Sequence, residues 1–191
     1  MTKQQMLIIL DLDETLVFGT KELLDSMPNF TAGEYHIYVR PHFESFIRSL
    51  SSQFRLAIWS SATDDYVFDV VENLISEDIN LEFVWARSNC KVKFKVQVDE
   101  YGYYDANPRN HYYYVKPLKK VKRRGFPLER VLIVDDTVSK SEENYGNVIY
   151  PKPYFGDKED NELLALLEYL QMLKEVDNVR EIEKRGWRNC L

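Results

Sequence analysis

A run of four aliphatic residues, 7–10, ends directly in Asp11, and this pattern constrains the fold more than any other feature of the sequence. A continuous apolar run of this length is typical of a strand that is buried on both faces. Two further apolar segments end in the same way. They are residues 54–59, followed by Ser60, and residues 130–134, followed by Asp135 and Asp136. The sequence therefore predicts buried strands with reactive side chains at their carboxyl ends.

Strand and helix patterns alternate along the chain, which favours an α/β fold with a mainly parallel sheet covered on both faces. Further strands are predicted at residues 34–40, 81–86 and 148–150. Helices are predicted to begin at Pro41, Thr63 and Asn161, where apolar residues recur at helical spacing. The length of 191 residues suits one compact domain, so residues 1–191 are expected to form it.

Residues 90–114 interrupt this alternation. Residues 91–98 show a strict period of two, in which lysines alternate with apolar side chains, and a turn is predicted around residues 99–102. Tyrosines follow on the far side of the turn. The pattern predicts a β-hairpin inserted into the sheet domain.

The strand ends are expected to form a metal site. Ligands bind outside the carboxyl ends of strands in open parallel sheets, so the aspartates that follow residues 7–10 and 130–134 should lie close together with Ser60. Carboxylates at such short distances repel one another unless a positive charge lies between them. A hard divalent cation with oxygen ligands, Mg²⁺ above all, satisfies this requirement.

Five segments form a set of motifs in a fixed order along the chain: Asp11-Leu12-Asp13-Glu14-Thr15-Leu16-Val17, Arg40-Pro41-His42-Phe43-Glu44-Ser45-Phe46, Trp59-Ser60-Ser61-Ala62, Val115-Lys116-Pro117-Leu118 and Val131-Leu132-Ile133-Val134-Asp135-Asp136-Thr137. Together they resemble the phosphatases of the RNA polymerase II C-terminal domain, a family within the haloacid dehalogenase superfamily of phosphotransferases. The ending, from Tyr154 through a helix to residue 179, is also similar. The resemblance implies a three-layer haloacid dehalogenase-like Rossmannoid sheet without a large cap domain, because residues 16–35 are too few to form one.

The resemblance also implies a role for each matching residue. Asp11 would be the nucleophile that forms an aspartyl-phosphate, and Asp13 would act as acid and base. Ser60 and Lys116 would stabilise the phosphoryl oxygens, with Ser61 beside them as a substrate contact. Taken without the motifs, Ser60 and Lys116 would be interpreted as a turn residue and a solvated lysine.

The metal ligands implied by the resemblance are Asp11, the backbone carbonyl of Asp13 and one of the pair Asp135 and Asp136. The family favours Asp136 as the direct ligand, with Asp135 orienting Lys116, but the sequence alone leaves this choice open. Two positions differ from the family pattern: Ser60 stands where threonine is usual, and Thr137-Val138 stands where Ser-Pro is common. Neither difference removes a reactive group.

The insert and its flanks are basic. Residues 87–124 contain eleven lysines and arginines against three acids, although the whole chain has a net charge of −6. One interpretation is a solvated lysine face on the hairpin. The alternative is a surface above the active site that recognises an anionic substrate, with Arg87 as a substrate contact. Aromatic residues among the cations would also suit single-stranded nucleic acid.

Three functions follow from these observations. The favoured one is a phosphatase that acts on phosphoserine or phosphothreonine in a phosphorylated protein or peptide. A phosphatase of small metabolites or of nucleic-acid terminal phosphates is the second, and a non-catalytic interaction module is the third. Only two cysteines are present, Cys90 and Cys190, and no signal peptide or membrane span is evident. A cytoplasmic location, or a nuclear one in a eukaryote, is therefore expected.

Overall fold

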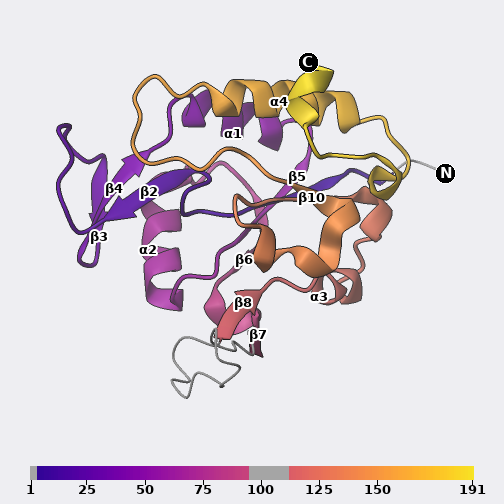
Figure 1. The fold of residues 1–191 in the computed structure, drawn as a ribbon, viewed down its shortest axis with the longest axis horizontal. Helices are drawn as coiled ribbons and strands as arrows, with labels where there is room; N and C mark the ends of the chain where they lie inside the picture. Colours follow the sequence, from indigo (N-terminus) through magenta and orange to yellow (C-terminus); the bar gives the residue numbers. More distant parts are fainter. Residues whose placement is uncertain (1–3, 95–111) are drawn as a thin grey trace, which may run out of the picture.

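The computed structural model describes residues 4–94 and 112–191, and a five-stranded parallel sheet lies at its centre (Figure 1). The strands lie in the order β10-β9-β1-β5-β6, and every neighbouring pair is parallel. Their bounds are β1 Leu7–Leu10, β5 Arg55–Trp59, β6 Leu81–Trp85, β9 Val131–Val134 and β10 Val148–Ile149. All five strands were predicted from the sequence, and their parallel pairing confirms the predicted α/β fold.

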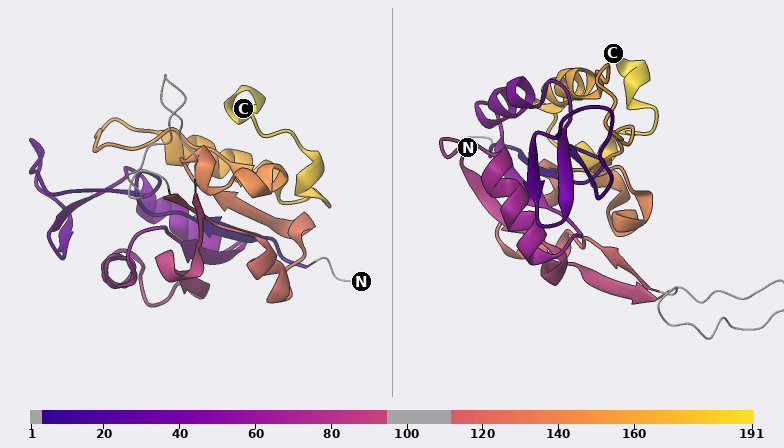
Figure 2. Two further views of the ribbon diagram at one scale, coloured as in Figure 1. Left: turned by 60° about the horizontal axis from the view of Figure 1, so that its bottom comes forward. Right: turned by 90° about the vertical axis from the view of Figure 1, so that its left-hand side faces the viewer.

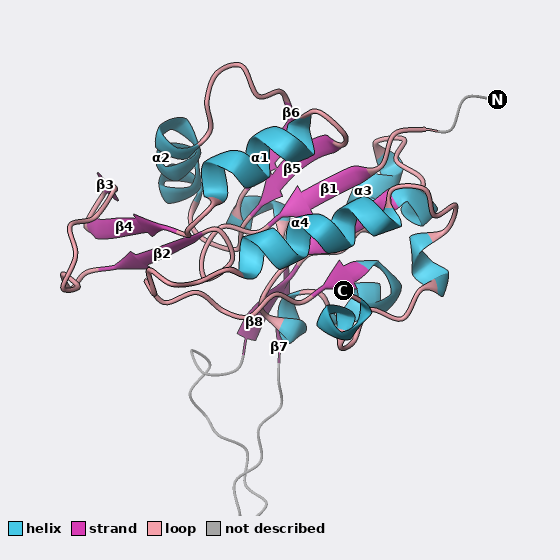
Figure 3. Ribbon diagram, turned by 90° about the horizontal axis from the view of Figure 1, so that it is seen from above, coloured by secondary structure: helices cyan, strands magenta, loops and turns pink. Residues whose placement is uncertain are grey.

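Helices cover both faces of this sheet, so the predicted three-layer arrangement is confirmed (Figure 3). The helices are α1 Phe43–Ser51, α2 Asp64–Leu74, α3 Lys119–Arg123 and α4 Glu162–Leu173. Side chains of β1 alternate between the two faces. Ile8 and Leu10 pack in the larger core with α1, α2 and α4, whereas Leu7 and Ile9 pack in a smaller core that includes side chains of α3 and its flanks.

A second, smaller sheet is formed by the segment between β1 and α1. Its antiparallel strands, in the order β2-β4-β3, are β2 Val17–Thr20, β3 Phe30–Ala32 and β4 Tyr35–Val39. It projects beside α2 at one end of the molecule (Figure 2). The predicted strand at residues 34–40 is β4. The sequence analysis missed β2 and β3, because both are short and β2 contains Gly19, which interrupts any alternation of side chains.

The first helix begins later than the sequence predicted. It was expected to begin at Pro41, but α1 begins at Phe43. His42 precedes it with a φ angle of 66°, which lies in the left-handed region and is incompatible with a right-handed helical turn. The chain must therefore pass His42 before the helix can start.

The C-terminal helix ends earlier than expected. It was predicted to continue to residue 179, but α4 ends at Leu173. The Asn178 side chain accepts a hydrogen bond from the backbone N–H of Arg180, which starts a separate 3₁₀ turn.

No helix among the described residues is both long enough and apolar enough to cross a membrane.

The two arms of the predicted hairpin pair with each other. Strand β7, Lys91–Phe94, is antiparallel to β8, Tyr112–Val115, and the predicted turn at residues 99–102 lies outside the described residues. The Lys93 ammonium contacts the Glu142 and Glu143 carboxylates at 2.8 and 2.6 Å, so this lysine is not simply solvated. Phe94, expected on an apolar side, is 74% exposed.

A buried arginine ties the segments around the sheet edge together. Arg40 is only 1% exposed, and its guanidinium donates to both carboxylate oxygens of Asp160, each at 2.8 Å. It also donates to the backbone carbonyls of Thr15 and Lys152 at 3.0 and 2.8 Å. Thr15 belongs to the turn that follows Asp13, so Arg40 fixes that turn against the chain that follows β10.

Replacing Arg40 by methionine is expected to lower the free energy of unfolding by about 3 kcal/mol, because Asp160 would be left as a buried charge without its partner. Urea denaturation followed by circular dichroism would measure the loss. Lys21→Met is the control, because Lys21 pairs with Glu34 in solvent and its loss should leave the unfolding midpoint unchanged. Equal midpoints for wild type and Arg40→Met would contradict this account.

Candidate active site

The structure brings the three predicted strand ends to one edge of the sheet. β1 lies between β5 and β9, so Asp11 after β1 is adjacent to Ser60 after β5 and to Asp135 after β9. All three side chains are buried. The register pairs Leu10 with Val134, which places Asp11 beside Asp135.

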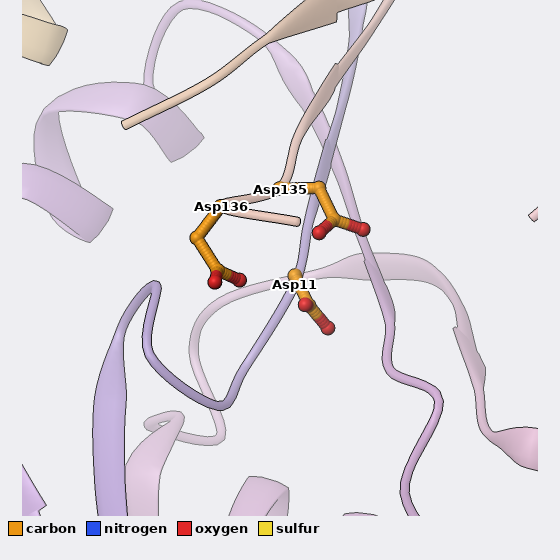
Figure 4. Close-up of side chains that lie close together, drawn as sticks. All are labelled: Asp11, Asp135 and Asp136. Carbon is orange, nitrogen blue, oxygen red and sulfur yellow. The ribbon is translucent and has the colours of Figure 1, made fainter. Parts of the chain in front are cut away.

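The side chains of Asp11, Asp135 and Asp136 lie close together at the ends of β1 and β9 (Figure 4). One oxygen from each lies within 4.8 Å of the others, a spacing that suits shared coordination of a metal ion. The three residues come from the two central strands of the sheet, β1 and β9. The predicted cluster of acidic residues therefore exists.

Lys116 is fully buried and joins two of these carboxylates. Its ammonium lies 2.8 Å from Asp11 Oδ1 and 2.6 Å from Asp135 Oδ2. Burial alone would lower the pKa of Lys116, but the two carboxylates outweigh this effect and raise it, so the lysine stays charged. The prediction that Lys116 lies at this site agrees with the structure, whereas the alternative of a solvated lysine does not.

A second lysine, Lys140, lies in the site although the sequence analysis did not select it. Its ammonium is 3.0 Å from Asp11 Oδ2, 4.0 Å from Asp135 Oδ1 and 3.9 Å from Asp136 Oδ1. Burial raises the pKa of Asp11, but the attraction of Lys116 and Lys140 outweighs it, so the net direction is downward. Its position in the sequence was the one available signal: Lys140 follows Asp136 by four residues, in the segment after β9, and could therefore reach the same carboxylates.

The two neighbouring aspartates after β9 have different surroundings. Both oxygens of Asp135 are engaged: Oδ2 accepts from Lys116, and Oδ1 accepts from the Thr137 N–H at 2.9 Å. In Asp136, Oδ2 accepts from the Thr137 hydroxyl at 3.1 Å, while Oδ1 is buried and has no hydrogen-bond partner. A buried oxygen without a hydrogen-bond donor is costly unless a cation approaches it.

The Asp13 carboxylate accepts hydrogen bonds from a side chain of α2 and from the residue that follows β5. The Tyr66 hydroxyl donates to Asp13 Oδ1 at 2.6 Å, and the Ser60 hydroxyl donates to Oδ2 at 3.4 Å. Burial raises the pKa of Asp13, although the hydrogen bond from Tyr66 opposes the shift. In the sequence, Tyr66 recurs at helical spacing with the apolar residues of its helix, and no pattern indicates that its hydroxyl reaches Asp13.

A cavity of about 270 Å³ opens beside Asp13, and its lining residues are Asp13, Glu14, Gly19, Tyr35, Ala62, Thr63, Tyr66 and Arg87. The Arg87 side chain donates to the Ser61 carbonyl at 2.9 Å, and its guanidinium lies over the Tyr114 ring at 5.1 Å. Arg87 therefore lies at the mouth of this cavity, and its role as a substrate contact stays a prediction. Ser61 contributes this backbone carbonyl, and it follows Ser60 at the edge of the sheet.

The sequence matches a family of phosphatases and several of its members. Residues 6–180 match the family described as NLI interacting factor-like phosphatase. CTD small phosphatase-like protein 2 of Dictyostelium discoideum is 30% identical over 91% of this chain and 28% of that protein. A CTD phosphatase-like protein of Invertebrate iridescent virus 3 is 28% identical over 88% of this chain and 96% of that protein. The human carboxy-terminal domain RNA polymerase II polypeptide A small phosphatase 1 is 25% identical over 92% of this chain and 62% of that protein.

This chain thus spans less than two thirds of the Dictyostelium and human relatives and nearly all of the viral one. Among solved structures, Fcp1, an essential RNA polymerase II CTD phosphatase, has a TM-score of 0.55 and 15% identity over 97% of this chain and 61% of that chain. A haloacid dehalogenase-like family hydrolase from Streptococcus pneumoniae has a TM-score of 0.54 and 14% identity over 90% of this chain and 100% of that chain. These likenesses confirm the haloacid dehalogenase-like fold.

Substituting Tyr66 by phenylalanine is expected to raise the pKa of Asp13 further, because the lost hydroxyl stabilises the ionised carboxylate. Carbon-13 NMR of the aspartate carboxyl groups, recorded across pH in the absence of divalent metal, would measure the shift. Tyr35→Phe is the matched control, because Tyr35 lines the same cavity and packs edge-on against the Tyr66 ring. An unchanged Asp13 titration in Tyr66→Phe would show that this contact is unimportant.

Proposed function

The chain belongs to the family of NLI interacting factor-like phosphatases, and from that premise we propose that it hydrolyses phosphomonoesters through an aspartyl-phosphate on Asp11. One observation carries the proposal: a buried carboxylate at the end of the central strand lies between two ammonium groups, and a second carboxyl group with a different environment follows two residues later. An ionised carboxylate and a second carboxyl group in a different environment suit nucleophilic phosphoryl transfer with separate acid–base catalysis.

Asp11 is suited to be the nucleophile because its carboxyl group is ionised and its backbone is fixed to the neighbouring strand. Burial opposes ionisation, but Lys116 and Lys140 lower the pKa of Asp11, so the carboxylate carries the charge needed for attack. Its backbone N–H donates to the Val134 carbonyl at 2.9 Å, which anchors the residue to β9. In the proposed reaction one carboxylate oxygen attacks phosphorus, the phosphorus–oxygen bond to the leaving alkoxide breaks, and the acyl phosphate forms.

Asp13 is suited to supply and recover the proton. Its raised pKa favours the protonated form when substrate arrives, as a general acid requires. The proton would pass to the leaving oxygen in the first step. The resulting carboxylate, with Tyr66 donating to it, would then take a proton from the water that attacks the acyl phosphate. Hydrolysis releases inorganic phosphate and restores Asp11.

The residues fit a divalent cation, with Mg²⁺ as the expected ion. Asp136 Oδ1 is buried without a hydrogen bond and lies in the same cluster as the oxygens of Asp11 and Asp135. Both oxygens of Asp135 already accept hydrogen bonds, which supports Asp136 as the direct ligand with Asp11, and Asp135 as the residue that orients Lys116. By family resemblance the Asp13 carbonyl would be a further ligand. When bound, Mg²⁺ would neutralise charge on the phosphoryl oxygens.

Ser60 and Lys116 would stabilise the charge that spreads over the phosphoryl oxygens in the transition state. The Ser60 hydroxyl is held at the strand end by the Ala62 N–H, which donates to it at 3.0 Å. Lys116 already lies 2.8 Å from the proposed nucleophile, so its charge is preorganised beside the reacting atoms.

We propose a phosphoserine or phosphothreonine protein or peptide as the substrate. The residues between β1 and α1 form only the small β2-β4-β3 sheet, so no large cap covers the site in the part of the chain that the structure describes. An uncapped site admits a macromolecular substrate, and several relatives are named as CTD phosphatases. A cytoplasmic or nuclear location accords with this substrate class and with two free cysteines, of which Cys90 is half-buried as a packing residue.

Asp11→Asn is expected to lower Mg²⁺-dependent hydrolysis of p-nitrophenyl phosphate by at least about a thousandfold, because the amide cannot act as the nucleophile. The rate of p-nitrophenol release, measured with MgCl₂ and with EDTA, tests both the residue and the metal. Asp25→Asn makes the same chemical change on the surface and should retain the wild-type rate. Hydrolysis that survives both EDTA and Asp11→Asn would refute the mechanism.

The substrate class is tested with phosphoserine peptides, a 5′-phosphorylated oligonucleotide and sugar phosphates at equal concentrations. Phosphopeptides are expected to have the highest kcat/KM. Arg87→Ala should raise the KM for the phosphopeptide about tenfold with little change in kcat, since Arg87 lies at the site mouth rather than at the nucleophile. Arg123→Ala is the surface control. Preference for the oligonucleotide with a steep salt dependence, or for sugar phosphates, would point to the alternative substrates.

A further inference from the structure

Lys140 lies within 4.0 Å of three carboxylates, and two of them, those of Asp11 and Asp136, are the proposed ligands of the divalent cation. Its ammonium contacts Asp11 Oδ2 at 3.0 Å and lies within 4.0 Å of an oxygen of both Asp135 and Asp136. Two of these oxygens, those of Asp11 and Asp136, belong to the residues proposed as ligands above. A cation that binds Asp11 and Asp136 would therefore be repelled by a positive charge that the chain itself supplies.

The two lysines of the site are held differently. The Lys116 side chain is completely buried, with contacts of 2.8 Å and 2.6 Å to two carboxylates. The Lys140 side chain is 17% exposed, and one of its three carboxylate contacts is as short as 3.0 Å. Its backbone is fixed, because the Lys140 carbonyl accepts from the Lys116 N–H at 2.8 Å. Lys140 thus has an anchored main chain and an ammonium that reaches the site from the solvent side.

Lys140 also contacts an oxygen of Asp11, the proposed nucleophile. The Lys116 ammonium lies 2.8 Å from Oδ1 of Asp11, although Oδ1 accepts no hydrogen bond, and the Lys140 ammonium donates to Oδ2 at 3.0 Å. Attack on phosphorus requires one oxygen that is directed at the substrate and free of such a contact. If Lys140 leaves Asp11, one oxygen becomes available while Lys116 remains in place.

We propose that Lys140 is a tethered competitor for the divalent cation: its ammonium neutralises the three carboxylates, and Mg²⁺ must displace it to bind. Two positive charges cannot share one set of oxygens without strong repulsion. Displacement weakens the apparent affinity for Mg²⁺ and releases Asp11 at the same time, so metal binding and exposure of the nucleophile are one event. This inference rests on the metal site of the proposed function.

The direct test is isothermal titration calorimetry of MgCl₂ into the full chain without substrate. Lys140→Met removes the charge and keeps the aliphatic stem, and it is expected to lower the Kd for Mg²⁺ about tenfold, within the usual range of coupling between ligands. Lys140→Arg keeps the charge and should not gain affinity. Lys119→Met removes an exposed lysine at the start of α3 and should keep the wild-type Kd. An unchanged or higher Kd in folded Lys140→Met would overturn the proposal.

Thermal unfolding gives a second readout in the same samples. In EDTA, Lys140→Met should have a lower Tm than wild type, because three carboxylates lose a counter-charge. Saturating Mg²⁺ should raise its Tm by more than that of wild type, because the added cation now replaces the missing one. A gain no larger than that of wild type would contradict the proposal.

A third measurement needs no variant. Acetylation of the wild-type chain by a limiting amine reagent, followed by peptide mass spectrometry, reports how accessible each lysine is. Mg²⁺ should increase labelling of Lys140 relative to Lys119, because the ammonium leaves the carboxylates. Equal or lower labelling of Lys140 with Mg²⁺ would overturn the proposal even if Lys140→Met failed to fold.

These outcomes are separable from those that test the function. An unchanged Mg²⁺ affinity in Lys140→Met, together with hydrolysis that Asp11→Asn abolishes, would reject the role of Lys140 and leave the phosphatase intact. A gain in affinity without turnover of any phosphomonoester would support the role of Lys140 and reject the proposed function. A lower kcat in Lys140→Met with unchanged Mg²⁺ affinity would make Lys140 a catalytic cation instead.

Discussion

The site depends on the buried contact between Asp11 and the ammonium groups of Lys116 and Lys140. Taking such charges out of water is expensive, and only short, well-placed ion pairs compensate for the cost. The partners come from three places in the chain: the end of β1, the residue after β8 and the loop after β9. Because each partner is needed to neutralise the others, the sheet edge and both loops must assemble together.

The rest of the fold holds these parts in register. The parallel pairing of β1 with β9 places Asp11 beside Asp135, and the hydrogen bond from the Lys116 N–H to the Lys140 carbonyl ties the two cationic segments together. Arg40 fixes the turn after Asp13 against the chain that follows β10. These contacts make the position of each charge a property of the whole domain, as precise electrostatic catalysis demands.

How far the sequence predicted this arrangement depends on the range of the interactions involved. Apolar runs such as residues 7–10 identify strands by local pattern, and the strand order of an open parallel sheet then gathers Asp11, Ser60 and Asp135. Lys140 and Tyr66 were missed because their contacts depend on where a flexible side chain ends in space. A lysine in a loop and a tyrosine on an apolar helix face have the same local pattern whether or not they reach a carboxylate.

The charges of the site also bear on the order in which ligands bind. Among the residues that the structure describes, four aspartates, 11, 13, 135 and 136, face two lysines, 116 and 140, so ionisation of all six groups leaves a surplus of negative charge in a largely buried space. A phosphate group brings more negative charge and would be repelled. Burial lessens the surplus by raising the pKa of Asp13, which favours its protonated form. The remaining surplus makes the binding of a divalent cation and the binding of a phosphoryl group mutually favourable, because each supplies the charge that the other lacks.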